Sequence, residues 1–309
     1  MKILIIGAGA YGLALSNVLN DKNKITIYSS LKNEIDNLKN THKNETLFPN
    51  ITLPNNIEFT NKIENIKADI ILIALPTNII EQEIIKIKEN IKNIPIIIAS
   101  KGIYKEKFVY EIVKEILPDN QLIVLSGPSF AKDLIEKQNI TLTLAGKNIE
   151  NIKQIFNEEY NTIETTEDII GTEICGTLKN IFAIGSGILE GLNKSESTKA
   201  SYLTKIINEI KIIIEQFNGN KETILLSCGI GDIILTCTSK SSRNYKLGYL
   251  IGNKIDTHEL EEYIKKTTIE GLNSLVEFKK IINKKHIESK TLDNIYEIIY
   301  SNKKPEEIL

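Results

Sequence analysis

The chain has 309 residues, of which 25% are charged and 41% hydrophobic, and its formal net charge is −2. These values are typical of a water-soluble globular protein with two domains, and one large domain is the alternative. No dense basic segment favours a nucleic-acid partner or an anionic membrane surface. No apolar run is long enough to predict a membrane span.

Cysteine and histidine are too few and too scattered to predict a metal site or a disulfide framework. The three cysteines, Cys175, Cys228 and Cys237, are expected to be small core residues. A glycine-rich motif stands at the N-terminus, where a signal peptide would lie, so a cytoplasmic location is expected.

The first stretch of the chain predicts a strand, a tight glycine turn and a helix. Residues 3–6 are apolar, and Gly7, Gly9 and Gly12 follow at once. Apolar residues then recur at helical spacing. This order suits a dinucleotide, whose pyrophosphate would lie close to backbone at the helix N-terminus. A plain tight turn is the alternative.

The rest of the first half alternates between strand and helix. Further strands are expected at 25–28, 69–75, 95–102, 121–129, 140–145 and 161–166. Helices are expected at 79–91 and 108–116, and residues 42–56 read as a loop. Such alternation predicts a mostly parallel sheet, with ligands at the carboxyl ends of its strands.

The end of the second strand leaves the choice of coenzyme open. NAD-binding domains carry an acid about 20 residues after the glycines, and none occurs at residues 28–30. Ser29, Ser30 and Lys32 would suit a 2′-phosphate, and ribose contacts from backbone or water are the alternative. The expected coenzyme is therefore NAD or NADP.

After Gly171 the strand pattern ends, and long helices are expected at about 174–189 and 199–217. We expect two domains, a dinucleotide-binding Rossmann-like domain at 1–171 and a helical substrate-binding domain at 172–309. The predicted fold class is α/β, an N-terminal doubly wound, mostly parallel sheet followed by an all-α domain.

Four charged residues stand out from their surroundings. Lys101 lies at a strand end, where it is either a solvated loop residue or a ligand contact. Lys179 borders an apolar helical stripe, as a snorkelling lysine or an active-site amine. Asp232 lies in an apolar run, where it caps a helix or pairs with a buried lysine. Arg243 stands between Ser242 and Asn244, in a solvated turn or at a phosphate.

Several separated motifs resemble bacterial-type NAD(P)-dependent glycerol-3-phosphate dehydrogenase over essentially the whole chain. They include Gly7-Ala-Gly-Ala-Tyr-Gly12, Ser100-Lys101-Gly102, Ser126-Gly-Pro-Ser129, Leu178-Lys179-Asn180, Gly231-Asp232 and Ser242-Arg243-Asn244. Ile269-Glu270-Gly271 completes the set. Tyr11 stands where Trp is usual, and Lys199 where Arg is usual.

The resemblance implies roles for individual residues. The catalytic residues would be Lys179, Lys101 and Asp232, with Lys179 as the acid/base. Substrate-binding residues would be Lys101, Gly127, Ser129, Lys179, Asp232, Ser242, Arg243 and Asn244. Cofactor-binding residues would be Gly7, Gly9, Ala10, Tyr11, Gly12, Ser30, Lys101, Ala131, Arg243, Thr268 and Glu270.

The implied reaction interconverts dihydroxyacetone phosphate and sn-glycerol 3-phosphate for glycerophospholipid synthesis. Lys179 should then have a lowered pKa, since burial and Lys101 lower it while Asp232 raises it. The partner is a phosphorylated triose, and a homodimer is left open. A related reductase or hydroxyacid dehydrogenase with another substrate is the alternative, and a non-enzymatic dinucleotide sensor is a third.

Overall fold

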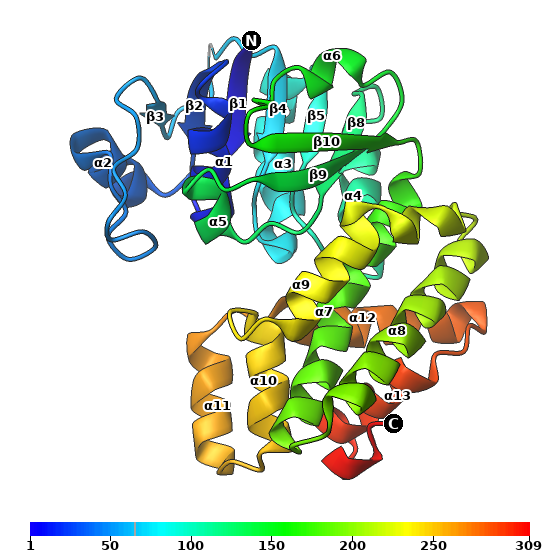
Figure 1. Ribbon diagram of the computed structural model, residues 1–309. Coiled ribbons are helices and arrows are strands. Elements are labelled where there is room, and N and C mark those ends of the chain that lie inside the picture. Colours follow the sequence, from blue (N-terminus) through cyan, green and yellow to red (C-terminus); the bar gives the residue numbers. More distant parts are fainter. Residues whose placement is uncertain (65) are drawn as a thin grey trace. The chain divides into compact units, whose positions relative to one another are not determined.

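The computed structural model describes residues 1–64 and 66–309 of the chain. They form two compact units (Figure 1). Unit 1 comprises Met1–Ser100 and Val109–Ile169, and unit 2 comprises Lys101–Phe108 and Ile170–Leu309. Within the described residues, no helix is long and apolar enough to cross a membrane.

Unit 1 is built on an eight-stranded sheet with the order β10-β9-β8-β5-β4-β1-β2-β3. Neighbouring strands are parallel except β8 and β9, which are antiparallel. The strands are β1 (Lys2–Ile6), β2 (Lys24–Tyr28), β3 (Glu58–Thr60), β4 (Ile70–Ile73), β5 (Ile96–Ile98), β8 (Leu122–Ser126), β9 (Ile140–Ala145) and β10 (Asn161–Thr166).

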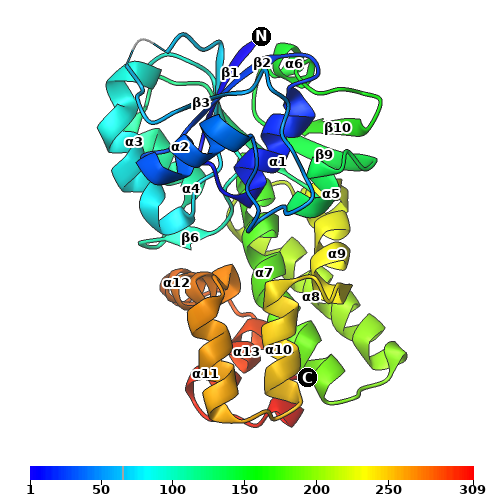
Figure 2. The same ribbon diagram turned by 90° about the vertical axis from the view of Figure 1, so that its left-hand side faces the viewer.

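Helices cover both faces of this sheet (Figure 2). On one face, Ile3 and Ile5 pack in a core with α1, α2, α5 and α6. On the other, Leu4 and Ile6 pack with α3 and α4. Burial on both faces explains the continuous apolar run of β1, as expected of a parallel strand. The helices are α1 (Ala10–Leu19), α2 (Lys32–Thr41), α3 (Thr77–Ile91), α4 (Val109–Ile116), α5 (Ala131–Ile135) and α6 (Glu150–Lys153).

The strand order reverses at β1. From β1 the sheet continues to β2 and β3 on one side and to β4, β5 and β8 on the other. Ligands of open α/β sheets bind beyond the carboxyl ends of the strands at such a reversal. Gly7 follows β1 and Ala74 follows β4, so the glycine turn lies at this point.

Unit 2 is helical apart from a short hairpin, β6 (Ile103–Tyr104) and β7 (Lys107–Phe108). The hairpin belongs to unit 2 because Phe108 packs edge-on against Phe217 and Phe278. The helices are α7 (Ile169–Gly191), α8 (Glu196–Gln216), α9 (Asp232–Thr238), α10 (Arg243–Gly252), α11 (Thr257–Lys266), α12 (Glu270–Lys285) and α13 (Lys290–Tyr300). Shorter turns are η1 (Lys221–Leu225), η2 (Ser227–Gly231) and η3 (Pro305–Glu307).

Helix α7 is the central helix of unit 2, and almost every residue from Gly171 onward is buried. It contacts α10 backbone to backbone. A Cβ at Gly248 of α10 would lie 1.9 Å from the carbonyl oxygen of Ile184, so only glycine fits there. This close contact joins the helix that carries Lys179 to the helix that begins with Arg243.

The predicted strands and long helices are confirmed as a mostly parallel sheet followed by a helical region. The antiparallel β9 extends the sheet, as expected for residues 140–145. Elements that were not predicted include α2, β3 and the β6–β7 hairpin.

Candidate active site

The glycine turn after β1 is fixed by close backbone contacts. Gly7 has φ +116°, and a Cβ there would lie 2.4 Å from the carbonyl oxygen of Ala74. A Cβ at Gly12 would lie 2.1 Å from the carbonyl oxygen of Gly7. Both positions therefore require glycine, one for its conformation and one for helix packing.

Gly9 differs from Gly7 and Gly12 because a Cβ there would meet no atom within 4 Å. It precedes α1, and no side chain caps the helix at this position. The space beside Gly9 and the backbone N–H groups of the first turn suit a pyrophosphate, since glycine lets the phosphates approach the backbone. The residues present therefore fit a dinucleotide coenzyme.

The loop after β8 holds the predicted substrate residues of unit 1. Gly127 has φ +139°. Ser129 donates a hydrogen bond to the carbonyl oxygen of Gly127 at 3.2 Å, and its hydroxyl lies 2.8 Å from that of Tyr11. Ala131 begins α5, which packs against α1. The structure thus joins a predicted cofactor residue, Tyr11, to a predicted substrate residue, Ser129.

At the end of β2, Ser29 is buried and Ser30 is exposed. The Ser29 hydroxyl donates a hydrogen bond to Glu34 Oε2 at 2.9 Å, and Lys32 forms an ion pair with Asp36. Neither Ser29 nor Lys32 is thus available to a 2′-phosphate without giving up a carboxylate partner. Glu34 was missed from the sequence because it lies in the next helix, five residues beyond Ser29.

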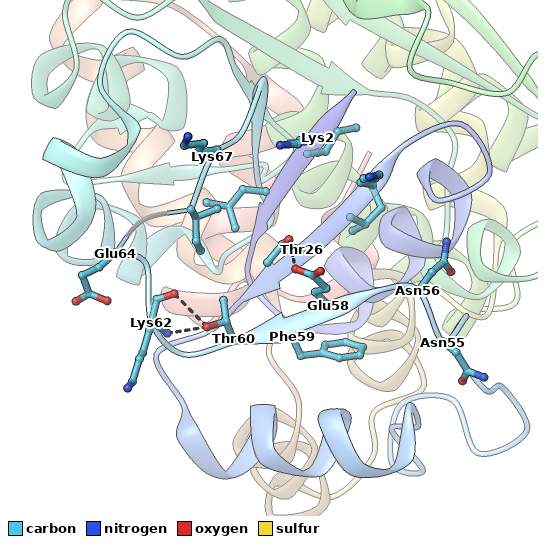
Figure 3. Close-up of a pocket in the computed structure, with 15 residues that line it drawn as sticks. Lys2, Thr26, Asn55, Asn56, Glu58, Phe59, Thr60, Lys62, Glu64 and Lys67 are labelled. Carbon is cyan, nitrogen blue, oxygen red and sulfur yellow. Dashed lines mark hydrogen bonds between the residues drawn. The ribbon is translucent and has the colours of Figure 1, made fainter.

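A pocket of about 900 Å³ opens beside the amino-terminal parts of β1 and β2 and along the whole of β3 (Figure 3). Lys2, Thr26, Glu58 and Thr60 are among the residues that line it, and Thr26 donates to Glu58. On β1 and β2 the pocket is lined by the residues at the strand ends remote from Gly7. This pocket is therefore not where a dinucleotide is expected in a parallel sheet.

In unit 2, Asp232 holds two lysines together. Its Oδ1 lies 2.5 Å from Lys179 Nζ and its Oδ2 lies 2.8 Å from Lys101 Nζ. Asp232 is fully buried, and Lys179 is 8% exposed. The lysine is therefore not a snorkelling residue. The aspartate does not cap its helix either, because Gly231 is the N-cap of α9. The three candidates lie at one place although 78 and 53 residues separate them along the chain.

Local structure fixes the aspartate at the start of α9. The turn η2 precedes it. Gly229 of that turn lies close to η1, since a Cβ at Gly229 would lie 2.2 Å from the carbonyl oxygen of Ile224. Thr236, one turn further along α9, donates to Asp232 Oδ1 at 3.4 Å. Because residues four apart share a helix face, the threonine helps orient the carboxylate.

The pKa values of the pair follow from burial and charge. Burial, supported by the positive charge of Lys101, lowers the pKa of Lys179 to about 8, although Asp232 opposes the shift. Burial would raise the pKa of Asp232, but the charges of Lys101 and Lys179 outweigh it and lower that pKa. The prediction of a lowered lysine pKa is confirmed, and the cluster is one carboxylate shared by two amines.

A network of buried amides connects this cluster to α10 and α12. Asn180, next to Lys179, accepts a hydrogen bond from Asn244 Nδ2 at 2.9 Å and donates to Glu270 Oε2 at 3.3 Å. Asn244 Oδ1 in turn accepts from the backbone N–H of Gly271 at 3.0 Å. The network fixes the first turns of α10 and α12 against α7. Asn180 was not among the predicted site residues, although a Lys-Asn pair in an apolar helix was a visible signal.

The remaining candidates lie at the first turn of α10 and before α12. Ser242 is buried and accepts a hydrogen bond from the backbone N–H of Tyr245 at 3.2 Å, which makes it the N-cap of α10. Arg243 and Thr268 are exposed. Among the residues that the structure describes, no group of His, Cys, Asp and Glu side chains is arranged to hold a metal ion.

A parallel sheet with a glycine turn that suits a dinucleotide, and a helical region with a buried lysine of lowered pKa, define the class of nicotinamide-dependent dehydrogenases. Models of the two halves of one such family match the chain. The model described as NAD-dependent glycerol-3-phosphate dehydrogenase N-terminus matches residues 2–152, and its C-terminus counterpart matches residues 168–309. The chain belongs to the NAD-dependent glycerol-3-phosphate dehydrogenase family.

Individual relatives agree with this assignment. The glycerol-3-phosphate dehydrogenase (NAD(P)+) of Clostridium botulinum is 33% identical, with 98% of this chain and 94% of that protein covered. The Leptospira biflexa protein of the same name is 32% identical, over 100% and 96% of the two chains. The crystal structure of glycerol-3-phosphate dehydrogenase from Coxiella burnetii matches with a TM-score of 0.91 at 28% identity, over 99% and 97%.

Proposed function

We propose that this chain is a glycerol-3-phosphate dehydrogenase that interconverts dihydroxyacetone phosphate and sn-glycerol 3-phosphate with NAD(H) or NADP(H). The observation that carries the proposal is the buried Lys101–Asp232–Lys179 cluster, in a chain whose two halves match the two halves of this family. The reaction needs a proton donor and a positive charge at the oxygen of the reacting carbon, and the two amines are chemically suited to supply both.

The coenzyme is held by the glycine turn of unit 1. Its pyrophosphate binds to the backbone of the turn, at Gly7, Gly9 and Gly12, and of the first residues of α1, Ala10 and Tyr11. When bound, its nicotinamide gives up or takes the hydride. We assign further coenzyme contacts to Ser30, Lys101, Ala131, Arg243, Thr268 and Glu270.

Lys179 acts as the acid/base. In the reducing direction its ammonium donates a proton to the substrate oxygen as the carbonyl becomes an alcohol. In the oxidising direction its neutral amine removes the alcohol proton. A pKa near 8 gives appreciable populations of both forms close to neutral pH, and burial is the main cause of that value.

Asp232 and Lys101 support this proton transfer. Asp232 orients the amine through its Oδ1 and balances one of the two positive charges. Lys101, held through Oδ2, lowers the pKa of Lys179 and supplies a second positive charge for the developing alkoxide.

The phosphate of the substrate is assigned to the first turn of α10. Ser242, Arg243 and Asn244 bring together a hydroxyl, a guanidinium and an amide at a helix N-terminus, which attracts anions. Gly127 and Ser129 of unit 1 are the other proposed substrate contacts. Binding the phosphate, remote from the reacting carbon, orients that carbon for transfer.

The role in glycerophospholipid synthesis follows from membership of the family. The domain assignment, with a dinucleotide-binding domain at 1–171 and a substrate domain at 172–309, stays a prediction. The cytoplasmic location also stays a prediction, and a homodimer stays an open possibility.

The test is a coenzyme-oxidation assay. Purified protein is mixed with NADH or NADPH, and the near-ultraviolet absorbance is followed after addition of dihydroxyacetone phosphate. We expect turnover with this substrate and none with dihydroxyacetone or ketopantoate. Turnover with ketopantoate alone would favour the related reductase, and coenzyme binding without turnover on any of the three would favour a sensor.

A further inference from the structure

An acidic side chain lies at the end of β2 that the sequence pattern did not predict. Glu34 lies in the first turn of α2, and its Oε2 accepts a hydrogen bond from Ser29 Oγ at 2.9 Å. Ser29 follows β2 directly, is 8% exposed, and its hydroxyl also accepts from the backbone N–H of Leu31 at 3.2 Å. The carboxylate is thus fixed at a strand end where residues 28–30 offer no acid.

This strand end adjoins the glycine turn. Ile6 of β1 pairs with Tyr28 of β2, and the backbone N–H of Gly7 donates to the carbonyl oxygen of Tyr28 at 2.9 Å. In dinucleotide-binding sheets the adenosine ribose lies beyond the second strand, beside this turn. Glu34 therefore occupies the place of the ribose-binding acid, although it comes from the following helix.

The charges around this position favour a hydroxyl over a phosphate. In the described residues, Glu34 Oε1 has no hydrogen-bond or ion-pair partner, so it can accept bonds from a ligand. The nearest lysine along the chain, Lys32, is already paired with Asp36 at 2.8 Å. A 2′-phosphate would therefore lie beside a carboxylate whose negative charge is not compensated by this lysine.

We propose that Glu34, oriented by Ser29, accepts hydrogen bonds from the ribose hydroxyls of the coenzyme and makes the protein prefer NAD(H) to NADP(H). This rests on the proposed function, because it takes the glycine turn to bind a nicotinamide dinucleotide. It replaces the expectation that Ser29, Ser30 and Lys32 accept a 2′-phosphate.

The test is an equilibrium titration of the full chain with NADH and with NADPH, followed by coenzyme fluorescence and independent of turnover. A pair of hydrogen bonds to a charged acceptor corresponds to roughly a tenfold to hundredfold preference for NADH. Glu34→Gln keeps the shape and removes the charge, so we expect the preference to fall to about threefold or less, with NADPH bound more tightly than by the wild type. Ser29→Ala should lower the preference by a smaller factor.

Glu45→Gln is the matched control. It removes the same charge from an exposed position beyond α2 and should leave the NADH/NADPH ratio unchanged. Equal affinities in the wild type, or an unchanged ratio in both Glu34→Gln and Ser29→Ala, would overturn the inference. A clear NADH preference without turnover on dihydroxyacetone phosphate would support it and contradict the proposed function instead.

Discussion

The glycine turn of unit 1 and the charged cluster of unit 2 are built in opposite ways. The turn is made of backbone, and its residues, 7–12, are contiguous in the sequence. The cluster is made of side chains, and Lys101, Lys179 and Asp232 come from three distant segments. A site made of contiguous backbone can be recognised from a motif, whereas a site made of distant side chains exists only when the fold is complete.

The sharpest test of the cluster is Lys179→Ala, because only side-chain chemistry is removed. We expect kcat to fall by roughly 10³-fold or more, since the proton donor and a positive charge are lost together. Steady-state kinetics measure the loss, and coenzyme binding to the glycine turn should change little. Lys199→Ala is the control, because that lysine pairs with Glu190 and Glu196 outside the cluster and should keep near-native kcat. Near-native turnover of Lys179→Ala would refute the mechanism.

Asp232→Ala tests whether the cluster also holds unit 2 together. The substitution leaves two amines beside a buried position without their shared carboxylate, and such losses cost about 3–5 kcal/mol of unfolding free energy. Urea denaturation followed by circular dichroism measures the change. Glu262→Ala removes an exposed partner of Lys266 and should cost less than about 1 kcal/mol. Similar costs for the two variants would show that the cluster does not contribute to stability.

Within the glycine turn, alanine substitutions at Gly7 and Gly9 should have different effects. Gly7→Ala forces a side chain onto a positive φ and against Ala74, so we expect a loss of about 1–3 kcal/mol of stability together with weaker coenzyme binding. Gly9→Ala meets no atom of the protein. It should therefore leave thermal unfolding unchanged and still weaken NADH binding by about tenfold, if phosphates lie against this backbone. Unchanged NADH affinity in Gly9→Ala would place the pyrophosphate elsewhere.

The two regions should also differ in their response to pH. Reduction of dihydroxyacetone phosphate needs protonated Lys179, whose pKa burial lowers to about 8. At pH values below about 8, kcat/KM should not depend on pH. At higher pH it should decrease, by up to about tenfold for each pH unit. Oxidation of glycerol 3-phosphate needs the neutral amine, so its rate should fall as the pH drops below about 8. NADH affinity, measured over the same range, should stay nearly constant, and parallel changes in affinity and rate would contradict the assignment.

The smallest expected effect concerns the link between Tyr11 and Ser129, whose hydroxyls lie 2.8 Å apart. Tyr11→Phe and Ser129→Ala should each raise KM for dihydroxyacetone phosphate severalfold. The double variant should be little worse than either single one, with a coupling energy of about 0.5–1.5 kcal/mol. Additive effects on KM would show that the hydroxyls act independently.

Some elements could be predicted because their signal is local. The apolar run of β1, the glycines after it and the long apolar pattern of α7 are each complete within a few turns of chain. By contrast, α2 buries only Ile35 and Leu38, so few apolar residues mark it in the sequence. The β6–β7 hairpin turns at Lys105 and Glu106, both with positive φ, where glycine or asparagine would have signalled a turn.

The sequence by itself determined the strand–turn–helix, the alternating sheet and the identity of the charged candidates. Only the tertiary structure decided that Asp232 is shared by both lysines, that Asn180 joins α7 to α10 and α12, and that Glu34 reaches the end of β2. The physical reason is that hydrogen bonds and ion pairs depend on distance in space. Backbone conformation and the periodic pattern of burial depend mainly on residues that are close in the sequence.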